Sequence, residues 1–210
     1  MPSRIAHWTP RYIYNRIRWG IYQRRNPDKP WLAPRAIELL STMLVPSDVG
    51  LEWGSGRSTC WFAGRMKHLT SIEDNPQWHQ RVSRMIAERG LSNVTYRLLP
   101  PPGESPAESQ YVHACDEFSD ETLGFALVDG SSREHCALNV IPKIAPGGLL
   151  VIDNINWFLD HPTHSPASRA GKGPLNAAWA EVTHKLAPWR MIWATSGVTD
   201  TAIWIRPAGV

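Results

Sequence analysis

Carboxylates stand at regular places in this chain of 210 residues, each directly after a short apolar run. Glu52 leads into a turn that contains Gly54 and Gly56, and Glu73 ends the next apolar run 21 residues later. Glycines permit a tight turn and let a ligand approach the backbone, and an acid at about this spacing can accept hydrogen bonds from a ribose diol. These residue types at this spacing indicate binding of a nucleotide-like ligand.

Two further acids follow apolar runs nearer the C-terminus. Asp129 is followed by Gly130, and Asp153 is followed by Asn154. In an open parallel sheet the carboxyl ends of the strands meet at one edge, where ligands bind. Four acids at that edge predict a functional cleft, in which Asp129 or Asp153 acts as a general base or orients a base such as His161.

The elements that must position these groups alternate along the chain. We expect strands at 49–52, 69–73, 94–99, 124–129, 149–153, 190–195 and 201–206, and helices at 9–25, 33–44, 58–67, 77–89, 109–116, 133–144 and 176–186. Such alternation predicts an α/β protein with a parallel sheet between two layers of helices. The last two strands have no helix between them, so we expect them to pair antiparallel at one side of the sheet.

The pattern resembles the class I S-adenosylmethionine-dependent methyltransferases. The motifs that carry the resemblance are Glu52-Trp-Gly-Ser-Gly-Arg-Ser58, Ser71-Ile-Glu73 and the closing strand pair. The resemblance implies a Rossmann-like three-layer sandwich over residues 45–210, with a seven-stranded, mostly parallel sheet whose last strand is antiparallel. A basic, aromatic helical cap would precede it over residues 1–44. An NAD-binding domain usually has a third glycine where this chain has Thr59, which disfavours that alternative.

The same resemblance implies S-adenosylmethionine as the methyl donor. The glycine turn would pass under the methionine portion of the donor, and Glu73 would hold the ribose hydroxyls. The candidate cofactor-binding residues lie after the first, second and fourth strands: Glu52, Gly54, Ser55, Gly56, Ser58, Glu73, Asp74, Asp129 and Gly130.

The fifth strand and its end, Pro146 to Asn154, resemble the matching part of the catechol-type, metal-dependent O-methyltransferases. In that group an Asp after the fourth strand and an Asp-Asn pair after the fifth hold a Mg²⁺-like ion. The matching residues here are Asp129, Asp153 and Asn154. An all-oxygen site suits such an ion, which would lower the pKa of a substrate hydroxyl. The chain has Ser132 where that group commonly has a Lys base, so a metal-free use of the same acids stays open.

Aromatic and histidine side chains follow the fifth strand over residues 156–166, the side from which the resemblance implies that the acceptor enters. The candidate acceptor contacts are Trp31, Arg133, Asn154, Trp157 and His164. We expect transfer of a methyl group to a small molecule, with oxygen as the methylated atom. An RNA methyltransferase and a non-catalytic binding protein on the same fold are the alternatives.

Residues 1–31 contain seven arginine or lysine residues against Asp28 alone, together with six aromatic residues. Such a segment can contact an anionic membrane or a nucleic acid, or it can pack on the domain through its aromatic rings with its arginines in solvent. Because the rest of the chain is slightly acidic, we expect no stable complex with nucleic acid. Peripheral membrane contact and a homodimer stay open.

Cysteine usage and hydropathy indicate the compartment. Cys60, Cys115 and Cys136 are odd in number and far apart, so we expect buried free thiols. No apolar run approaches the roughly 20 residues that a membrane-spanning helix needs, and the first residues lack the apolar core of a signal peptide. The expected location is the cytoplasm.

Overall fold

A seven-stranded sheet forms the centre of the protein, whose computed structural model describes residues 8–208. The strand order is β3-β2-β1-β4-β5-β7-β6. The strands are β1 Val49–Trp53, β2 His68–Glu73, β3 Val94–Leu98, β4 Leu123–Val128, β5 Ile144–Asp153, β6 Arg190–Thr195 and β7 Asp200–Ile205. Within the described residues β7 alone runs opposite to the other six strands, and it pairs antiparallel with both β5 and β6. The Rossmann-like sandwich with an antiparallel last strand is therefore confirmed.

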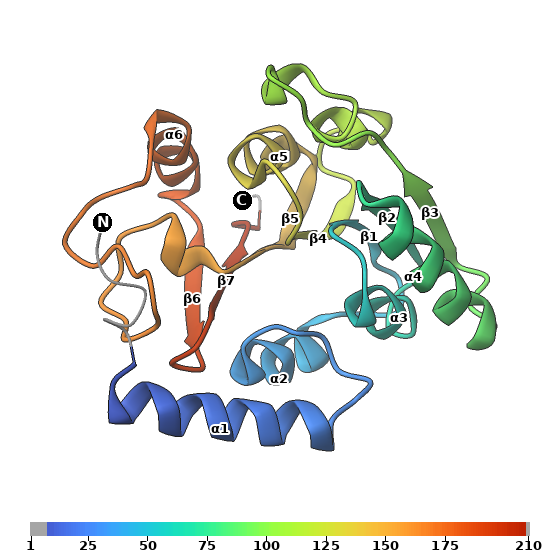
Figure 1. Ribbon diagram of the computed structural model, residues 1–210. Coiled ribbons are helices and arrows are strands. Elements are labelled where there is room, and N and C mark those ends of the chain that lie inside the picture. Colours follow the sequence, from blue (N-terminus) through green and yellow to red (C-terminus); the bar gives the residue numbers. More distant parts are fainter. Residues whose placement is uncertain (1–7, 209–210) are drawn as a thin grey trace.

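Helices cover both faces of the sheet (Figure 1). The helices are α1 Pro10–Arg25, α2 Pro34–Met43, α3 Arg57–Ala63, α4 Pro76–Glu88, α5 Arg133–Val140 and α6 Ala177–Leu186, and the short 3-10 turns are η1 Pro106–Glu108, η2 Val112–Glu117, η3 Ile141–Lys143 and η4 Ile155–Trp157. On one face α2 and α3 pack against the sheet, and on the other α5 and α6 do. No described helix is long and apolar enough to cross a bilayer.

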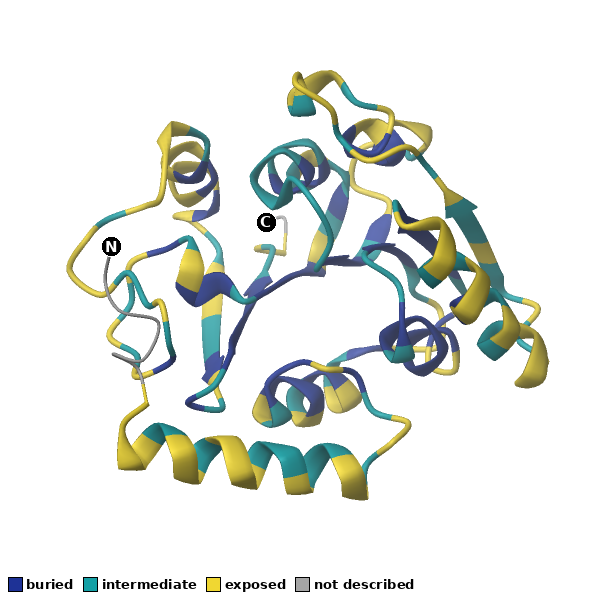
Figure 2. Ribbon diagram, viewed as in Figure 1, coloured by how far each residue is buried: buried dark blue, intermediate teal, exposed yellow. Residues whose placement is uncertain are grey.

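The central strands are buried on both faces, which explains their nearly continuous apolar sequences. Figure 2 shows β1, β4, β5 and β7 as the most buried part of the molecule. On the first face Phe62 of α3 packs against Phe125 of β4, with their ring centroids 4.5 Å apart. On the second face Trp179 of α6 is fully buried beside Phe158. The three cysteines are buried free thiols, as expected.

The two helices of the expected N-terminal cap are held differently. α2 buries Ala36, Ile37 and Leu40 in the first core, whereas α1 has no buried residue. α1 begins where the Thr9 hydroxyl accepts a hydrogen bond from the Tyr12 amide, and it lies outside α2 as a further layer (Figure 2). α2 is therefore part of the folded core, and α1 rests on its surface.

Several boundaries differ from the expected ones, mostly at proline and glycine. The helix expected at 58–67 ends at Ala63, before Gly64, and the helix expected at 109–116 is the 3-10 turn η2. α5 ends at Val140 rather than 144, since Pro142 follows at once in η3. β5 begins at Ile144 rather than at 149. The residues from Pro146 to Gly148 were expected to form a turn before the strand, but in the structure they belong to the strand, whose pairing with β4 shifts register at this point. The closing strands pair antiparallel as expected, with β7 inserted between β5 and β6.

Candidate active site

The loops after β1 and β4 meet where the strand order reverses, because β1 pairs with β2 on one side and with β4 on the other. Gly54 has a φ of +86°, and a Cβ atom there would lie 2.8 Å from the backbone of Asp129 and Gly130. Only glycine combines this backbone conformation with so close an approach. The glycine turn thus stands at the switch point where open α/β sheets bind ligands.

Glu73, at the end of β2, is hydrogen-bonded to the glycine turn. One of its carboxylate oxygens accepts hydrogen bonds from the amide and the hydroxyl of Ser55, at 3.1 and 2.7 Å. The other accepts from the amides of Asp74 and Asn75, at 3.2 and 3.0 Å. The Ser55 hydroxyl also lies 2.6 Å from that of Tyr96. The predicted ribose acid and the predicted glycine turn are therefore in direct contact.

Glu52, at the end of β1, is completely buried. Its Oε2 accepts hydrogen bonds from the hydroxyls of Thr59 and Ser71, at 2.6 and 2.7 Å, and its Oε1 has no partner within residues 8–208. Burial raises the pKa of Glu52 to about 7, against the opposing effect of the nearby hydroxyl groups of Ser58, Thr59 and Ser71. An unpaired buried carboxylate oxygen is costly, so it suits a ligand that brings a donor or a cation.

A cavity of about 100 Å³ lies beside the glycine turn. Its lining residues come from the turn, α4, the end of β4 and the segment before α2: Trp31, Ser55, Gly56, Arg57, Ser58, Trp78, Arg81, Met85 and Asp129. The Arg57 guanidinium lies 5.4 Å from the ring centroid of Trp31, and the Trp78 indole donates a hydrogen bond to the Ser55 carbonyl at 2.7 Å. The structure thus groups Trp31 with the predicted cofactor residues rather than with the acceptor residues.

Arg133, the first residue of α5, connects the ends of β4 and β5. Its Nε donates to the Gly130 carbonyl, and one terminal nitrogen donates to the Asp153 carbonyl and to Asn154 Oδ1. The other terminal nitrogen donates to the Asp129 carbonyl at 2.9 Å and pairs with Asp129 Oδ1 at 3.0 Å. A guanidinium has five N–H donors, and these five acceptors use all of them. The predicted contact between Arg133 and an acceptor is therefore not supported.

The three predicted Mg²⁺ ligands do not form an open cation site. Oxygens of Asp129 and Asn154 face the Arg133 guanidinium. The Asp153 carboxyl is 2% exposed and accepts hydrogen bonds from Thr201 Oγ1 at 2.5 Å and from Asn154 Nδ2 at 2.9 Å. Burial, with repulsion from Asp129 as a second cause, raises the pKa of Asp153 to about 8. A fixed guanidinium among these oxygens, beside a carboxyl whose two oxygens are both hydrogen-bonded within the protein, does not fit a divalent ion, which needs several oxygens facing one point.

Asp129 is the more accessible of the two predicted bases. Its side chain is 28% exposed and lines the cavity beside the glycine turn. Burial raises its pKa, and the Arg133 charge and hydrogen bond act in the opposite direction. A ligand in the cavity can therefore reach Asp129, whereas Asp153 is hydrogen-bonded within the protein.

The remaining candidate residues, Trp157, His161 and His164, lie in the segment after β5 and do not contact Asp129 or Asp153 in the described structure. His161 stacks on Trp193 of β6, with ring centroids 4.1 Å apart. His164 lines a cavity of about 480 Å³ with residues at the start of α1, and Trp157 is exposed. The described contacts of the two histidines include neither Asp129 nor Asp153. The prediction that His161 partners a catalytic carboxylate is therefore not supported, because the loop leads toward β6 and α1.

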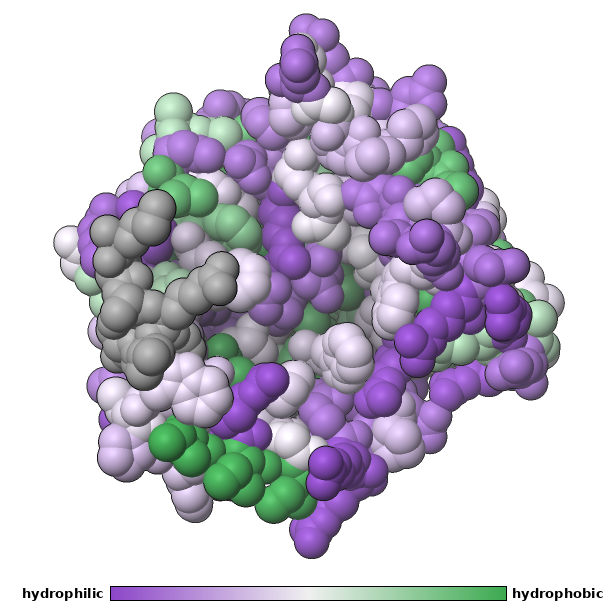
Figure 3. All heavy atoms as spheres, in the orientation of Figure 1, coloured by the Kyte–Doolittle hydropathy of each residue, from purple (hydrophilic) through white to green (hydrophobic). Residues whose placement is uncertain are grey.

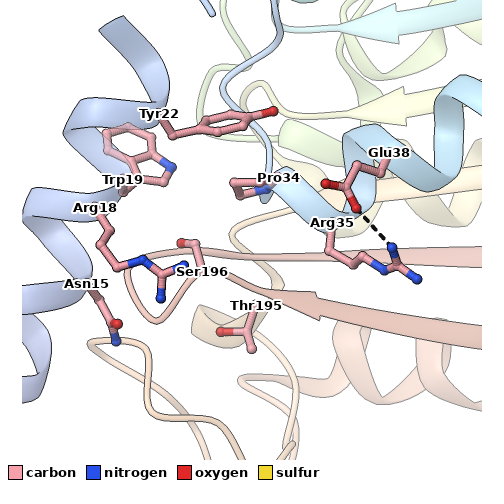
Figure 4. A pocket seen from close by; sticks show the side chains of 9 residues that line it. All are labelled: Asn15, Arg18, Trp19, Tyr22, Pro34, Arg35, Glu38, Thr195 and Ser196. Carbon is pink, nitrogen blue, oxygen red and sulfur yellow. Dashed lines mark hydrogen bonds and ion pairs between the residues drawn. The ribbon is translucent and has the colours of Figure 1, made fainter. Parts of the chain in front are cut away.

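A larger cavity of about 450 Å³ lies between α1, α2 and the carboxyl end of β6 (Figure 4). Its lining residues are Asn15, Arg18, Trp19, Tyr22, Pro34, Arg35, Glu38, Thr195 and Ser196. The indole nitrogen of Trp19 and the hydroxyl of Tyr22 are buried without a partner among the described residues, and Figure 4 shows both side chains reaching from α1 toward α2.

Hydrogen bonds in the turn between β6 and β7 link this cavity to the residues after β5. Ser196, at its wall, donates a backbone hydrogen bond to Thr199, and the Thr199 hydroxyl accepts one from Asn154 Nδ2 at 2.6 Å. Of the predicted acceptor residues, Asn154 thus stands between the acids and this cavity. Sequence patterns do not reveal the cavity, because it depends on where α1 lies.

Three aromatic residues support the glycine turn and the β4 loop without a motif that assigns them there. Tyr96 and Trp78 both hydrogen-bond to Ser55. The Tyr111 hydroxyl accepts a hydrogen bond from the Ser131 amide at 3.2 Å. Of these three residues, only Tyr96 could be placed near the site from the sequence. It lies on the strand expected at 94–99, whose carboxyl end was expected at the same edge of the sheet as the acids.

Comparison with known proteins agrees with this geometry. A family model described as "Methyltransferase domain" matches residues 51–155, from β1 to the turn after β5. No curated protein matches the chain.

Solved structures of methyltransferases share the fold. A methyltransferase-like protein from Silicibacter pomeroyi is 22% identical with a TM-score of 0.56, over 87% of this chain and 90% of that one. A putative methyltransferase from Streptococcus mutans, solved in complex with SAH, is 10% identical with a TM-score of 0.55, over 80% and 93%. An rRNA methylase from Streptococcus thermophilus is 10% identical with a TM-score of 0.55, over 81% and 93%. Since the family model covers half of the chain, the protein belongs to this methyltransferase family and is an S-adenosylmethionine-dependent methyltransferase.

Proposed function

We propose that the protein methylates an oxygen atom of a small-molecule acceptor, with Asp129 as the general base and without a divalent metal ion. The observation that carries the proposal is the pairing of the accessible Asp129 carboxylate with the Arg133 guanidinium at the switch point. Arg133 supplies a fixed positive charge at the place where the metal-dependent group would hold an ion.

The residues of the glycine turn fit the methyl donor. S-adenosylmethionine, when bound, supplies a methyl group on a positively charged sulfur that an acceptor oxygen can attack in line. Glu73 would hold the ribose hydroxyls in exchange for some of its present hydrogen bonds to Ser55, Asp74 and Asn75. Glu52, buried next to the cavity-lining Ser58, would face the cationic end of the donor. The cavity of about 100 Å³ is smaller than the roughly 300 Å³ typical of the smallest ligand pockets. Trp31 on Arg57 is the side chain that would move to widen it.

Asp129 would take the proton of the acceptor hydroxyl as the new carbon–oxygen bond forms and the carbon–sulfur bond breaks. A general base works best when its pKa lies close to the working pH, and burial moves the pKa of Asp129 upward in that direction. The Arg133 charge limits this rise, so the carboxylate stays available as a base.

The cavity between α1, α2 and β6 shares no lining residue with the donor cavity, so it is our candidate for the pocket that holds the body of the acceptor while the acceptor hydroxyl reaches toward Asp129. Its volume of about 450 Å³ lies in the range of small-molecule sites, roughly 300–1,000 Å³. Arg18 and the unpaired donors of Trp19 and Tyr22 favour an acceptor rich in oxygen atoms, such as a carboxylate-bearing phenol or alcohol.

Isothermal titration with S-adenosylmethionine and S-adenosylhomocysteine tests the donor site. Glu73→Ala should weaken both affinities by about 10- to 100-fold, because charged hydrogen bonds to the ribose are lost. Glu88→Ala, at an exposed position of α4, is the matched control and should bind as the wild type does. Binding that is equal in both variants would contradict the assigned ribose site.

An acceptor screen tests the chemistry. Oxygen-rich small molecules and RNA are incubated with labelled donor in the presence of either EDTA or Mg²⁺. Transfer to a small molecule at equal rates under both conditions is expected. A strict Mg²⁺ requirement, transfer to RNA alone, or donor binding without any transfer would each contradict the proposal.

A further inference from the structure

The outward side of α1 exposes a row of large apolar side chains. Ile13, Ile17 and Ile21 follow one another at four-residue spacing, so they lie on one side of the helix. Their exposed fractions are 41%, 57% and 44%, and that of the adjacent Tyr14 is 60%. Figure 3 shows an apolar band where Figure 1 places α1. We call these four residues the isoleucine ridge.

Arginines flank the isoleucine ridge. Arg11, Arg18 and Arg25 recur every seven residues and so form a second row on the Tyr14 side, in which Arg18 also lines the cavity toward α2. Arg16 lies on the other side, and Arg24, seven residues after Ile17, ends the row of the isoleucines. The helix contains no Asp or Glu. Its opposite side carries Asn15, Trp19 and Tyr22, which line the cavity toward α2. α1 therefore has a side that packs on the protein and a side that is apolar at its centre and cationic at its edges.

We propose that α1 docks the protein on an anionic membrane surface, lying in the plane of the lipid headgroups with the isoleucine ridge inserted. Helices that lie in a membrane interface have this arrangement, with an apolar side, basic flanks and a modest overall hydropathy. Arginine stems can bury their methylene groups along the apolar row while their guanidinium groups reach lipid phosphates. The proposal does not depend on the acceptor or on the reaction.

Charge argues for lipid rather than for a second copy of the chain. Pairing α1 with α1 about a twofold axis would bring two sets of five arginines together without an acidic residue in either helix. A surface rich in anionic lipid instead attracts each basic side chain near it. The isoleucine ridge then adds apolar burial that electrostatic attraction alone does not provide.

Sedimentation with vesicles tests the docking. The full chain is mixed with vesicles of phosphatidylcholine alone or of an equimolar mixture of phosphatidylcholine and phosphatidylglycerol. Binding to the mixed vesicles alone is expected. The double variant Ile13→Ser/Ile17→Ser should bind about tenfold less tightly or worse. Arg24→Gln/Arg25→Gln should weaken binding about fivefold for each charge removed.

Val45→Ser is the matched control, since Val45 is an apolar residue of similar exposure (47%) in the turn between α2 and β1. It should bind vesicles as the wild type does. Circular dichroism and donor titration verify that each variant is folded, because the changed side chains lie outside the donor site. Equal vesicle binding by the isoleucine variant and the wild type would overturn the proposal. So would a wild-type dimer that this variant converts to a monomer, or RNA binding that replaces vesicle binding.

Discussion

At the scale of single residues, the site depends on how buried charges are compensated. Arg133 satisfies acceptors from the ends of both β4 and β5 with one planar group, a geometry that a lysine cannot reproduce. The pKa of the neighbouring Asp153 is raised to about 8, because its carboxyl is buried and lies beside Asp129. The pattern of acids after strands was enough to predict which residues meet. It did not reveal their roles, because the direction of the Arg133 side chain and the burial of Asp153 are set by packing.

Glu52 leads to a prediction about pH. Its pKa is raised from 4.5 to about 7 in the folded protein, so the folded state binds more protons than the unfolded state between these values. The free energy of unfolding should therefore fall as pH rises from about 4.5 to about 7, by up to roughly 3 kcal/mol from this group. Urea unfolding at pH 5 and at pH 8 measures this difference.

Glu52→Gln removes the titrating group and keeps a side chain of similar size. The loss of stability between pH 5 and pH 8 should be smaller in this variant than in the wild type, with Asp153 accounting for part of what remains. Glu88→Gln, at an exposed position, should follow the wild type. A Glu52→Gln profile that parallels the wild-type profile would show that Glu52 does not hold the extra proton.

At the scale of elements, the decisive feature is how α1 lies on the turn between β6 and β7. Gly197 in that turn has a φ of +72°, and a Cβ atom there would meet the Asn15 side chain of α1. Helical spacing predicts that α1 exists, and its amphipathic pattern indicates two different sides. Neither predicts which loop it contacts, since no buried residue anchors it and the contact joins segments about 180 residues apart in the sequence.

Gly197→Ala should therefore displace α1. We expect the acceptor KM to rise about tenfold with little change in donor affinity. The added methyl group would move Asn15, which lines the candidate acceptor cavity between α1, α2 and β6. Gly90→Ala is the matched control, since Gly90 has a φ of +61° and open space around it. Both variants incur a backbone cost of about 1 kcal/mol in stability. An equal acceptor KM in both would show that α1 does not shape the acceptor pocket.

At the scale of the whole molecule, Thr201 in β7 joins parts that lie far apart in sequence. Its hydroxyl donates to Asp153 at the end of β5 and accepts a hydrogen bond from the Ala33 amide before α2. Alternating elements predicted the layers and the antiparallel pairing of the last two strands, because those follow from chain connectivity. The antiparallel direction of the last strand within the sheet was implied by the methyltransferase resemblance. The insertion of β7 between β5 and β6 does not follow from the same rules, since a hairpin could equally add its other strand to β5.

Thr201→Val tests this connection. The change keeps the shape of the side chain but leaves the buried Ala33 amide and the Asp153 carboxyl each without one partner. The free energy of unfolding should fall by about 2–3 kcal/mol, and more of the loss should appear at high pH, where Asp153 is ionised. Thr42→Val, where the hydroxyl contacts only its own helix, should change stability by about 0.5 kcal/mol or less. Urea unfolding of both variants decides the point.

The position of β7 between β5 and β6 also bears on how the protein is made. While the ribosome synthesises residues up to about 195, β5 has one edge without its partner strand, because the neighbour that covers it is translated last of the seven. An open apolar strand edge invites pairing with other chains. The acids at the end of β5 likewise acquire their final hydrogen bonds only when Thr201 arrives. Nascent chains of this methyltransferase should therefore need protection by chaperones until β7 has been translated.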